Sequence, residues 1–114
     1  MGNCLFCRIA AGEVPATRVL ESPRTFAFRD INAQAPTHVL VVTKEHHRDL
    51  AAVAEAADGL LDEMAGLARR VAEAEGIADS GYRVVFNTGA QAGQTVFHVH
   101  AHVLGGRDLD WPPG

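Results

Sequence analysis

The sequence predicts an α+β fold: an antiparallel sheet of about five strands, one long helix and a short N-terminal helix. Most apolar segments of the 114-residue chain are short, rich in β-branched residues and bounded by turn-forming residues, which is typical of strands. Only residues 50–71 form a long segment that repeats its apolar side chains every three or four residues. We expect a single domain over residues 1–114, because two independent cores would be very small at this length.

The first half of the chain contains one predicted helix and three predicted strands. The apolar stretch 5–12 has helical spacing and ends at a glycine, which predicts a short helix. Residues 19–21 and 25–30 flank a turn-forming Ser-Pro-Arg sequence and predict a hairpin. Residues 38–43 contain a short run of β-branched and other apolar side chains, which favours a strand covered on both faces.

The second half contains the long helix and two late strands. The spacing of apolar residues over 50–71 predicts an amphipathic helix. Asp58 can start the main segment, because its side-chain oxygen can accept hydrogen bonds from the free amides of the first turn, and Gly76 offers a left-handed stop. Residues 82–87 and 96–104 predict two strands, separated by a loop rich in glycine and amide side chains.

The composition excludes several classes of protein. The chain has 10 basic and 14 acidic side chains, with a formal charge of −4 and both signs interspersed. It therefore lacks the basic face that broad binding to nucleic acid or to an acidic membrane requires. No window approaches the roughly 18 consecutive apolar residues of a membrane span, and the N-terminus lacks the pattern of a secretory signal. We expect a cytoplasmic protein that binds neither nucleic acid nor membrane.

Histidine is the most unusual feature of the composition, because three of the six histidines alternate along the last predicted strand. Side chains alternate across a strand, so His98, His100 and His102 are expected to project from one face. The opposite, apolar face is expected to comprise Phe97, Val99, Ala101 and Val103. Histidine changes its charge near neutral pH, which suits it to nucleophilic or acid–base chemistry and to metal binding.

Two interpretations of these histidines compete. In the first, the imidazoles hold a zinc ion that activates water. In the second, one imidazole attacks phosphorus and its neighbours hold the phosphate oxygens. The preceding loop, residues 87–95, offers backbone amides beside glycines together with amide and hydroxyl side chains, and these donors suit an oxyanion. The loop alone is equally compatible with an ordinary hairpin connection, but beside the histidines it favours phosphate chemistry.

The segment His98–Leu104 resembles the His-φ-His-φ-His-φ-φ motif, with φ apolar, of the histidine triad family of nucleotide hydrolases and transferases. The resemblance extends over nearly the whole chain, through residues 35–38, 93–97, 104–107 and 111–114. The ending resembles the Hint branch, the purine nucleoside phosphoramidases, more than the dinucleoside polyphosphate hydrolases or the uridylyltransferases. The resemblance implies a homodimer that binds a purine nucleotide and cleaves phosphoramidates or adenylylated compounds at the α-phosphorus.

The same resemblance implies roles for individual residues. His100 would be the nucleophile and would form a nucleotidylated histidine without a catalytic cofactor, and His38 would orient the site or relay protons. His102 and Thr95 would assist catalysis, and Asp30 would accept hydrogen bonds from the ribose hydroxyls. The phosphate would be contacted by His102, Asn87, Gly93, Gln94 and Thr95. The base would lie in an apolar slot formed by Leu5, Phe6, Ile9, Phe28, Ile31 and Leu40, although core packing explains each of these residues equally well when taken alone.

Cys4 and Cys7 have the spacing of two zinc ligands, and tetrahedral zinc needs two more. The resemblance supplies them, because some bacterial members of the triad family bind zinc at positions that match His46 and His98. We therefore expect a structural Zn²⁺ that ties the N-terminal helix to the sheet; the alternative is two free thiols and a surface histidine. His47 has no partner that the sequence indicates and is expected to be solvated.

Other functions remain open at this level. Hydrolysis of dinucleoside polyphosphates is one, and a nucleotide-binding regulatory protein whose slow turnover is incidental is another. The C-terminal segment 111–114 is rigid and aromatic, and it either docks against a partner subunit's site or is an unanchored terminus. The sequence does not indicate the preferred base or the natural leaving group.

Overall fold

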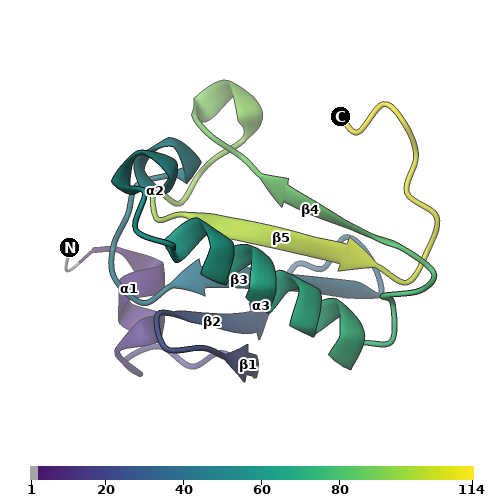
Figure 1. Ribbon diagram of the computed structural model, residues 1–114, viewed down its shortest axis with the longest axis horizontal. Coiled ribbons are helices and arrows are strands. Elements are labelled where there is room, and N and C mark those ends of the chain that lie inside the picture. The colour runs from purple at the N-terminus through teal and green to yellow at the C-terminus, as the bar shows by residue number, and fades with distance from the viewer. Residues whose placement is uncertain (1–2) are drawn as a thin grey trace.

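A computed structural model describes residues 3–114, in which five strands form one antiparallel sheet in the order β1-β2-β3-β5-β4 (Figure 1). The strands are β1 (Arg18–Glu21), β2 (Thr25–Arg29), β3 (Thr37–Thr43), β4 (Tyr82–Phe86) and β5 (His100–Gly105). The helices are α1 (Leu5–Ala10), α2 (Leu50–Ala56), α3 (Leu60–Ala74) and the short 3₁₀ helix η1 (Ala90–Ala92). The predicted α+β class and five-stranded antiparallel sheet are confirmed.

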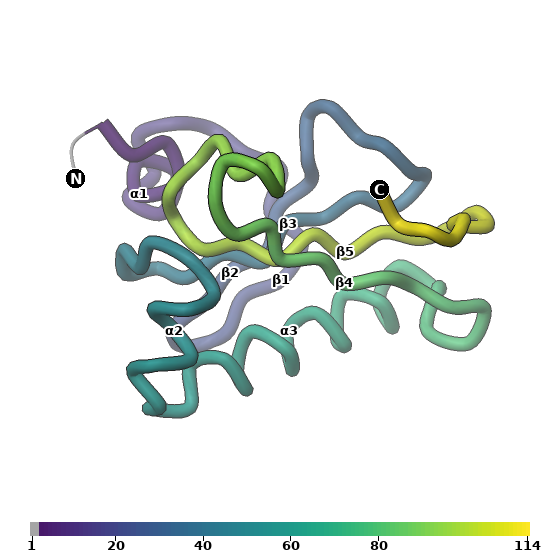
Figure 2. Tube along the Cα trace, turned by 90° about the horizontal axis from the view of Figure 1, so that it is seen from above, coloured from purple at the N-terminus to yellow at the C-terminus, as the bar shows by residue number. Residues whose placement is uncertain are grey.

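The sheet separates two apolar clusters. Figure 2 shows α3 along one face, with α1 and the loop that contains η1 on the opposite side. The larger cluster lies beneath α3 and includes Val39, Val41 and Val103, which are fully buried or nearly so. The smaller cluster lies under α1 and includes Phe6, Phe28 and other apolar residues of β2 and β3. Because β3 pairs with β2 on one side and β5 on the other, all seven of its residues are buried, as predicted for a strand covered on both faces.

The predicted single helix over 50–71 is wrong, because the structure divides it into α2 and α3. Between them Ala57 adopts a left-handed conformation with φ 51°, and Gly59 follows with φ 88°. Asp49 caps α2 by accepting a hydrogen bond from the Ala52 amide at 3.0 Å. Asp58 accepts from the Leu60 amide at 3.2 Å, as predicted for a first-turn amide, although it lies one residue before Gly59, the N-cap of α3. Residues 3–114 therefore contain three α-helices in place of the two expected.

The last strand is also shorter than predicted, because β5 begins at His100 and residues 96–99 lie outside the ladder. Both neighbouring strands end beside this point: Phe86 of β4 pairs with Ala101, and Val42 of β3 pairs with His100. The Val99 amide donates to the His47 carbonyl at 2.7 Å, so the preceding segment is held by the connection after β3.

Two further predictions concern the end of α3 and membrane-spanning helices. Gly76 follows α3 with φ 73°, which fits the predicted left-handed stop. Among the helices of the described residues, none has the length and apolar character needed to span a membrane.

Candidate active site and metal centre

A row of aromatic rings lies between α1 and the sheet. Phe6 of α1 lies edge-on between two triad histidines, with ring centroids 5.9 Å from His98 and 5.0 Å from His100. The row continues to His102, 5.1 Å from His100, and ends at His38 of β3, 5.2 Å from His102. The alternation predicted for the triad therefore holds in space, although His98 precedes the strand. Phe97 departs from it, since its side chain is exposed instead of joining the apolar face.

His100 is held in one tautomer by the backbone. Its Nδ1 lies 2.8 Å from the carbonyl oxygen of His98, and because a carbonyl only accepts, Nδ1 carries the proton. In the neutral ring Nε2 then keeps its lone pair. Burial lowers the pKa of His100, which favours this neutral form. The geometry therefore supplies an uncharged imidazole nitrogen that can act as a nucleophile.

His38 and His102 form a directed hydrogen-bond chain. The Gln34 amide donates to Nδ1 of His38 at 3.0 Å, so the proton of neutral His38 lies on Nε2. Nε2 of His38 lies 2.9 Å from Nδ1 of His102 and donates to it. Nε2 of His102 then carries a proton and is a donor. Burial, together with the nearby rings of His100 and His38, lowers the pKa of His102 to about 4.

Asp30 completes this end of the site. Its Oδ2 lies 3.4 Å from Nε2 of His38, and its Oδ1 accepts from the Asn32 amide at 2.8 Å. Asp30, His38 and His102 place their ligand atoms within 4.8 Å of one another, as in a site with two histidines and one carboxylate. The Gln34 hydrogen bond argues against a metal here, because it leaves Nε2 of His38 protonated and unable to coordinate. The group fits proton relay and hydroxyl binding better.

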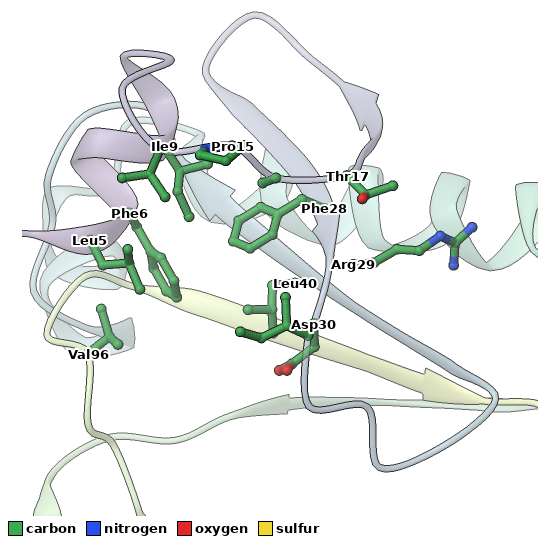
Figure 3. A pocket seen from close by; sticks show the side chains of 13 residues that line it. Leu5, Phe6, Ile9, Pro15, Thr17, Phe28, Arg29, Asp30, Leu40 and Val96 are labelled. Atoms are coloured by element: carbon green, nitrogen blue, oxygen red, sulfur yellow. The ribbon is translucent and has the colours of Figure 1, made fainter.

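A cavity of about 670 Å³ opens beside these rings. Asp30 lies at one end, and Leu5 and Val96 lie at the other (Figure 3). All six residues of the predicted base slot line the cavity, together with Asp30: Leu5, Phe6, Ile9, Phe28, Ile31 and Leu40. Sequence reasoning missed the wall formed by residues 14–17, which belong to an irregular connection between α1 and β1 with no periodic pattern. The cavity therefore brings together the residues assigned to base and ribose.

The glycine-rich loop gives a mixed result for the predicted phosphate contacts. Gln94 is buried, and its side chain is engaged within the protein: Oε1 accepts from the Gly89 amide at 2.9 Å, and Nε2 donates to the carbonyls of Arg48 and Val96. Its side chain therefore shapes the loop, and its contact with phosphate stays a prediction. Gly93, with φ 86°, ends η1. Thr95 is exposed and lines a second cavity of about 390 Å³.

Asn87 and His47 are the remaining polar residues for which the sequence predicts a role or an environment. Asn87 directly follows β4 and is half-buried. His47 is not solvated as predicted: the residue is half-buried, and its Nε2 is shielded from solvent without a hydrogen-bond partner. The His47 carbonyl accepts a hydrogen bond from the Val99 amide, and this bond connects His47 to the segment before β5.

The four predicted zinc ligands converge on one point. The ligand atoms of Cys4, Cys7, His46 and His98 all lie within 4.8 Å of one another. Nδ1 of His98 is 3.2 Å from Sγ of Cys4 and 3.4 Å from Sγ of Cys7, and Nδ1 of His46 is 3.5 Å from Sγ of Cys7. Two thiols and two imidazoles at these separations can hold one tetrahedral metal ion.

The surroundings orient the His98 ligand. Nε2 of His98 donates to the Thr43 carbonyl at 2.7 Å, so Nδ1 presents its lone pair to the sulfurs. Burial lowers the pKa of His98 to about 4, which keeps the ring neutral as coordination requires. Without a metal, burial and the neighbouring Cys4 raise the pKa of Cys7 to about 11. A bound cation would have to displace a proton from each thiol.

Comparison with known proteins identifies the family. The model of the HIT domain matches residues 11–109, which is most of the chain. The chain belongs to the HIT family. It is similar to a protein of Zea mays named 14 kDa zinc-binding protein, with 45% identity over 112 residues, 96% of this chain and 87% of the other.

Solved structures of HIT proteins have the same fold. A HIT family hydrolase from Legionella pneumophila matches with a TM-score of 0.93 and 49% identity, over 98% of this chain and 100% of the other. A Zn-bound histidine triad family protein from Mycobacterium smegmatis matches with a TM-score of 0.83 and 34% identity, over 96% of this chain and 79% of the other. The predicted family is therefore confirmed, whereas the Hint branch stays a prediction.

The C-terminal segment follows β5 along the edge of the HIT domain. Nη2 of Arg83, on β4, donates to the Asp110 carbonyl at 2.9 Å. Trp111 is 81% exposed, so its ring is available to a neighbouring molecule. Its docking on a partner subunit stays a prediction.

Proposed function

We propose that the protein is a nucleotide hydrolase that cleaves purine nucleoside phosphoramidates, or other adenylylated compounds, at the α-phosphorus. The observation that supports this most directly is the tautomer of His100: the His98 carbonyl holds the Nδ1 proton, which leaves Nε2 as a neutral nucleophile. The neighbouring cavity is large enough for a nucleoside, with an apolar wall for the base and the Asp30 carboxylate for the ribose.

The reaction has two steps. Nε2 of His100 attacks the α-phosphorus in line with the leaving amine, so that a phosphorus–Nε2 bond forms as the bond to the amine breaks. The leaving nitrogen takes a proton from a nearby donor, for which Nε2–H of His102 and the Thr95 hydroxyl are the candidates. Water then attacks phosphorus, the bond to Nε2 breaks, and a nucleoside monophosphate leaves. A proton from that water restores the donor.

Substitution of the nucleophile tests this function. His100→Ala should abolish hydrolysis of an adenosine 5′-phosphoramidate, a loss of at least about a thousandfold, because the covalent route is then closed. Rapid quenching followed by mass spectrometry should detect adenylylated protein for the wild type and not for the variant. Thermal unfolding verifies that the variant is folded.

A dinucleoside polyphosphate assayed in parallel separates the proposal from its alternatives. Faster turnover of that compound would favour a polyphosphate hydrolase. Equal turnover of the phosphoramidate by wild type and His100→Ala would contradict the nucleophile assignment and leave only nucleotide binding.

We also propose that Cys4, Cys7, His46 and His98 bind a structural zinc ion. The convergence of their ligand atoms supports it, as do the zinc-binding protein of Zea mays and the Zn-bound structure from Mycobacterium smegmatis. Bound zinc would join α1 to the segment before β5, and it would keep Nδ1 of His98 out of the chemistry. Thiolate ligands suit a reducing compartment, and we place the protein in the cytoplasm. Elemental analysis of untagged protein should give one zinc per chain.

The edge strand β4 supports a homodimer. Tyr82 and Val84 on this strand are exposed apolar residues at an edge of the sheet, and an unpaired edge is a template for a second copy. Sedimentation equilibrium should give twice the mass of the 12.2 kDa chain. A monomer at micromolar concentration would contradict this proposal.

A further inference from the structure

A second cavity adjoins the nucleotide cavity and has no role in the steps above. Its volume is about 390 Å³, and Val96 lines both cavities, so the two lie on either side of that residue. Its wall also contains Thr95 and the exposed ring of Phe97. In-line displacement sends the leaving group away from the nucleophile. A substrate whose phosphate lies by Thr95 and Val96 can therefore place its nucleoside in the first cavity and its leaving group in the second.

Arg48 is the only arginine or lysine that lines this second cavity among the residues described. Its guanidinium lies over the Phe97 ring, 4.4 Å from the centroid. Its carbonyl accepts from Nε2 of Gln94 at 3.0 Å, and the carbonyl of His47 accepts from the Val99 amide. These contacts fix Arg48 against the same loop that presents Thr95. The Arg48 side chain is 66% exposed, so it is the stacking on Phe97 that orients the charge before a substrate arrives.

Arg48 has one long ion pair, which leaves most of its guanidinium able to meet an anion. Oδ2 of Asp49 lies 3.9 Å from Nε of Arg48, and Oδ1 of Asp49 caps α2. The proposed zinc site nearby would be neutral when filled, because two thiolates balance the divalent ion. The protein as a whole has a charge of −4 and repels anions at long range, so an anionic group is attracted here only locally.

We propose that Arg48 and Phe97 form a leaving-group subsite that selects substrates whose leaving amine bears an anion, such as the carboxylate of an amino acid. This inference rests on the hydrolase function proposed above and names the class of its substrate. The guanidinium pairs with the anion, and the Phe97 ring supports the guanidinium from behind. Arg48 touches the leaving group and takes no part in bond breaking.

Two adenosine 5′-phosphoramidates that differ only by a carboxylate test the subsite: the amide of tryptamine and the amide of tryptophan. The measured quantity is the ratio of kcat/KM for the tryptophan compound to that for the tryptamine compound, which cancels general effects of a substitution. Arg48→Glu should lower this ratio by about five- to tenfold, as expected when an exposed attractive charge becomes repulsive. Arg48→Lys should keep most of the wild-type ratio, and added salt should lower the ratio in the wild type.

The outcomes separate this inference from the proposed function. If the wild type hydrolyses both compounds and Arg48→Glu has the wild-type ratio, the subsite is refuted and the hydrolase stands. If the wild type hydrolyses neither compound, the proposed function fails and the subsite with it. Phe97→Leu gives a further check that depends on the ring: the ratio should fall below that of the wild type, toward that of Arg48→Glu, and an unchanged ratio would contradict the role of Phe97.

Discussion

In each triad histidine, the hydrogen bond made by one ring nitrogen determines whether the other nitrogen carries a proton or a free lone pair. Nε2–H of His98 donates to the Thr43 carbonyl, and Nδ1 faces the cysteines. Nδ1–H of His100 donates to the His98 carbonyl, and Nε2 keeps its lone pair. Nδ1 of His102 accepts a hydrogen bond from Nε2–H of His38, so its own proton lies on Nε2. Three identical side chains at two-residue spacing are thus prepared for three different proposed roles: metal ligand, nucleophile and hydrogen-bond donor.

The lowered pKa of His102 predicts a pH dependence of stability. Its pKa is about 4 in the folded protein against 6.5 for an exposed imidazole, so the unfolded chain binds more protons below pH 6.5. The contribution of His102 is therefore complete above pH 6.5 and is lost as the pH falls toward 4. His102→Gln keeps an acceptor for His38 but cannot titrate. Between pH 6.5 and 4.5 the free energy of unfolding should fall by about 2 kcal/mol more in the wild type than in this variant.

Denaturant unfolding at several pH values measures this difference. Loss of zinc in acid affects both proteins, so it cancels in the comparison. Parallel curves for wild type and His102→Gln would contradict the lowered pKa.

The residue types of the site could be predicted from the sequence, but their tautomers could not. The alternation of His98, His100 and His102 follows from a two-residue spacing. The partners that fix their protons are backbone groups of Thr43, His98 and, through His38, Gln34. Every residue has such groups, so the sequence contains no signal for them. The hydrogen bonds of the Gln94 side chain to backbone groups of Gly89, Arg48 and Val96 have no sequence signal for the same reason.

At the scale of elements, α1 joins the metal centre to the nucleotide cavity. Within seven residues it and its N-cap supply two proposed metal ligands, Cys4 and Cys7, and three cavity residues, Leu5, Phe6 and Ile9. A helix this short has little stability of its own. Its position depends on contacts at both sites, so changes at the metal centre are expected to reach the cavity.

The break between α2 and α3 predicts a stabilising substitution. Ala57 has φ 51°, a left-handed conformation that costs a residue with a Cβ about 1–2 kcal/mol relative to glycine. Ala57 is exposed, so glycine removes no packing there. After the greater flexibility of glycine in the unfolded chain is subtracted, Ala57→Gly should raise the free energy of unfolding by about 0.5–1 kcal/mol. Thermal or urea unfolding measures this; a lower stability would show that the strain at this position is absent.

The same break explains why the helix boundary was mispredicted. The apolar residues Val53, Leu60, Met64 and Leu67 stay close to a single helical repeat across the interruption, and all four are buried. Periodicity reports which residues face the core, and two helices packed on the same sheet satisfy that pattern as well as one. Nothing in the sequence indicates the left-handed conformation of Ala57, because alanine is the strongest helix former.

At the scale of the whole molecule, the sequence predicts the strands better than their arrangement. Four of the five strands lie within about one residue of their predicted bounds, because each apolar run ends at turn residues. The order β1-β2-β3-β5-β4 places β5 between β3 and β4, which brings His102 against His38, 64 residues earlier in the chain. That pairing depends on tertiary packing, and only the family resemblance indicated it.

Removal of zinc should therefore have two linked effects on the molecule. The proposed ligands lie in α1, in the connection after β3 and just before β5, so the ion joins three segments far apart in sequence. A ligand that binds only the folded state at 100 times its Kd adds about 2.7 kcal/mol of stability, and chelation should lower the free energy of unfolding by at least about this amount. It should also weaken AMP binding, because Leu5, Phe6 and Ile9 lose their anchor. Calorimetry with and without chelator measures both the stability and the AMP affinity. The double variant Cys4→Ser/Cys7→Ser should resemble the chelated wild type, and the chelator should change neither quantity in this variant. Unchanged stability and AMP affinity after complete zinc removal would show that the site does not support the fold.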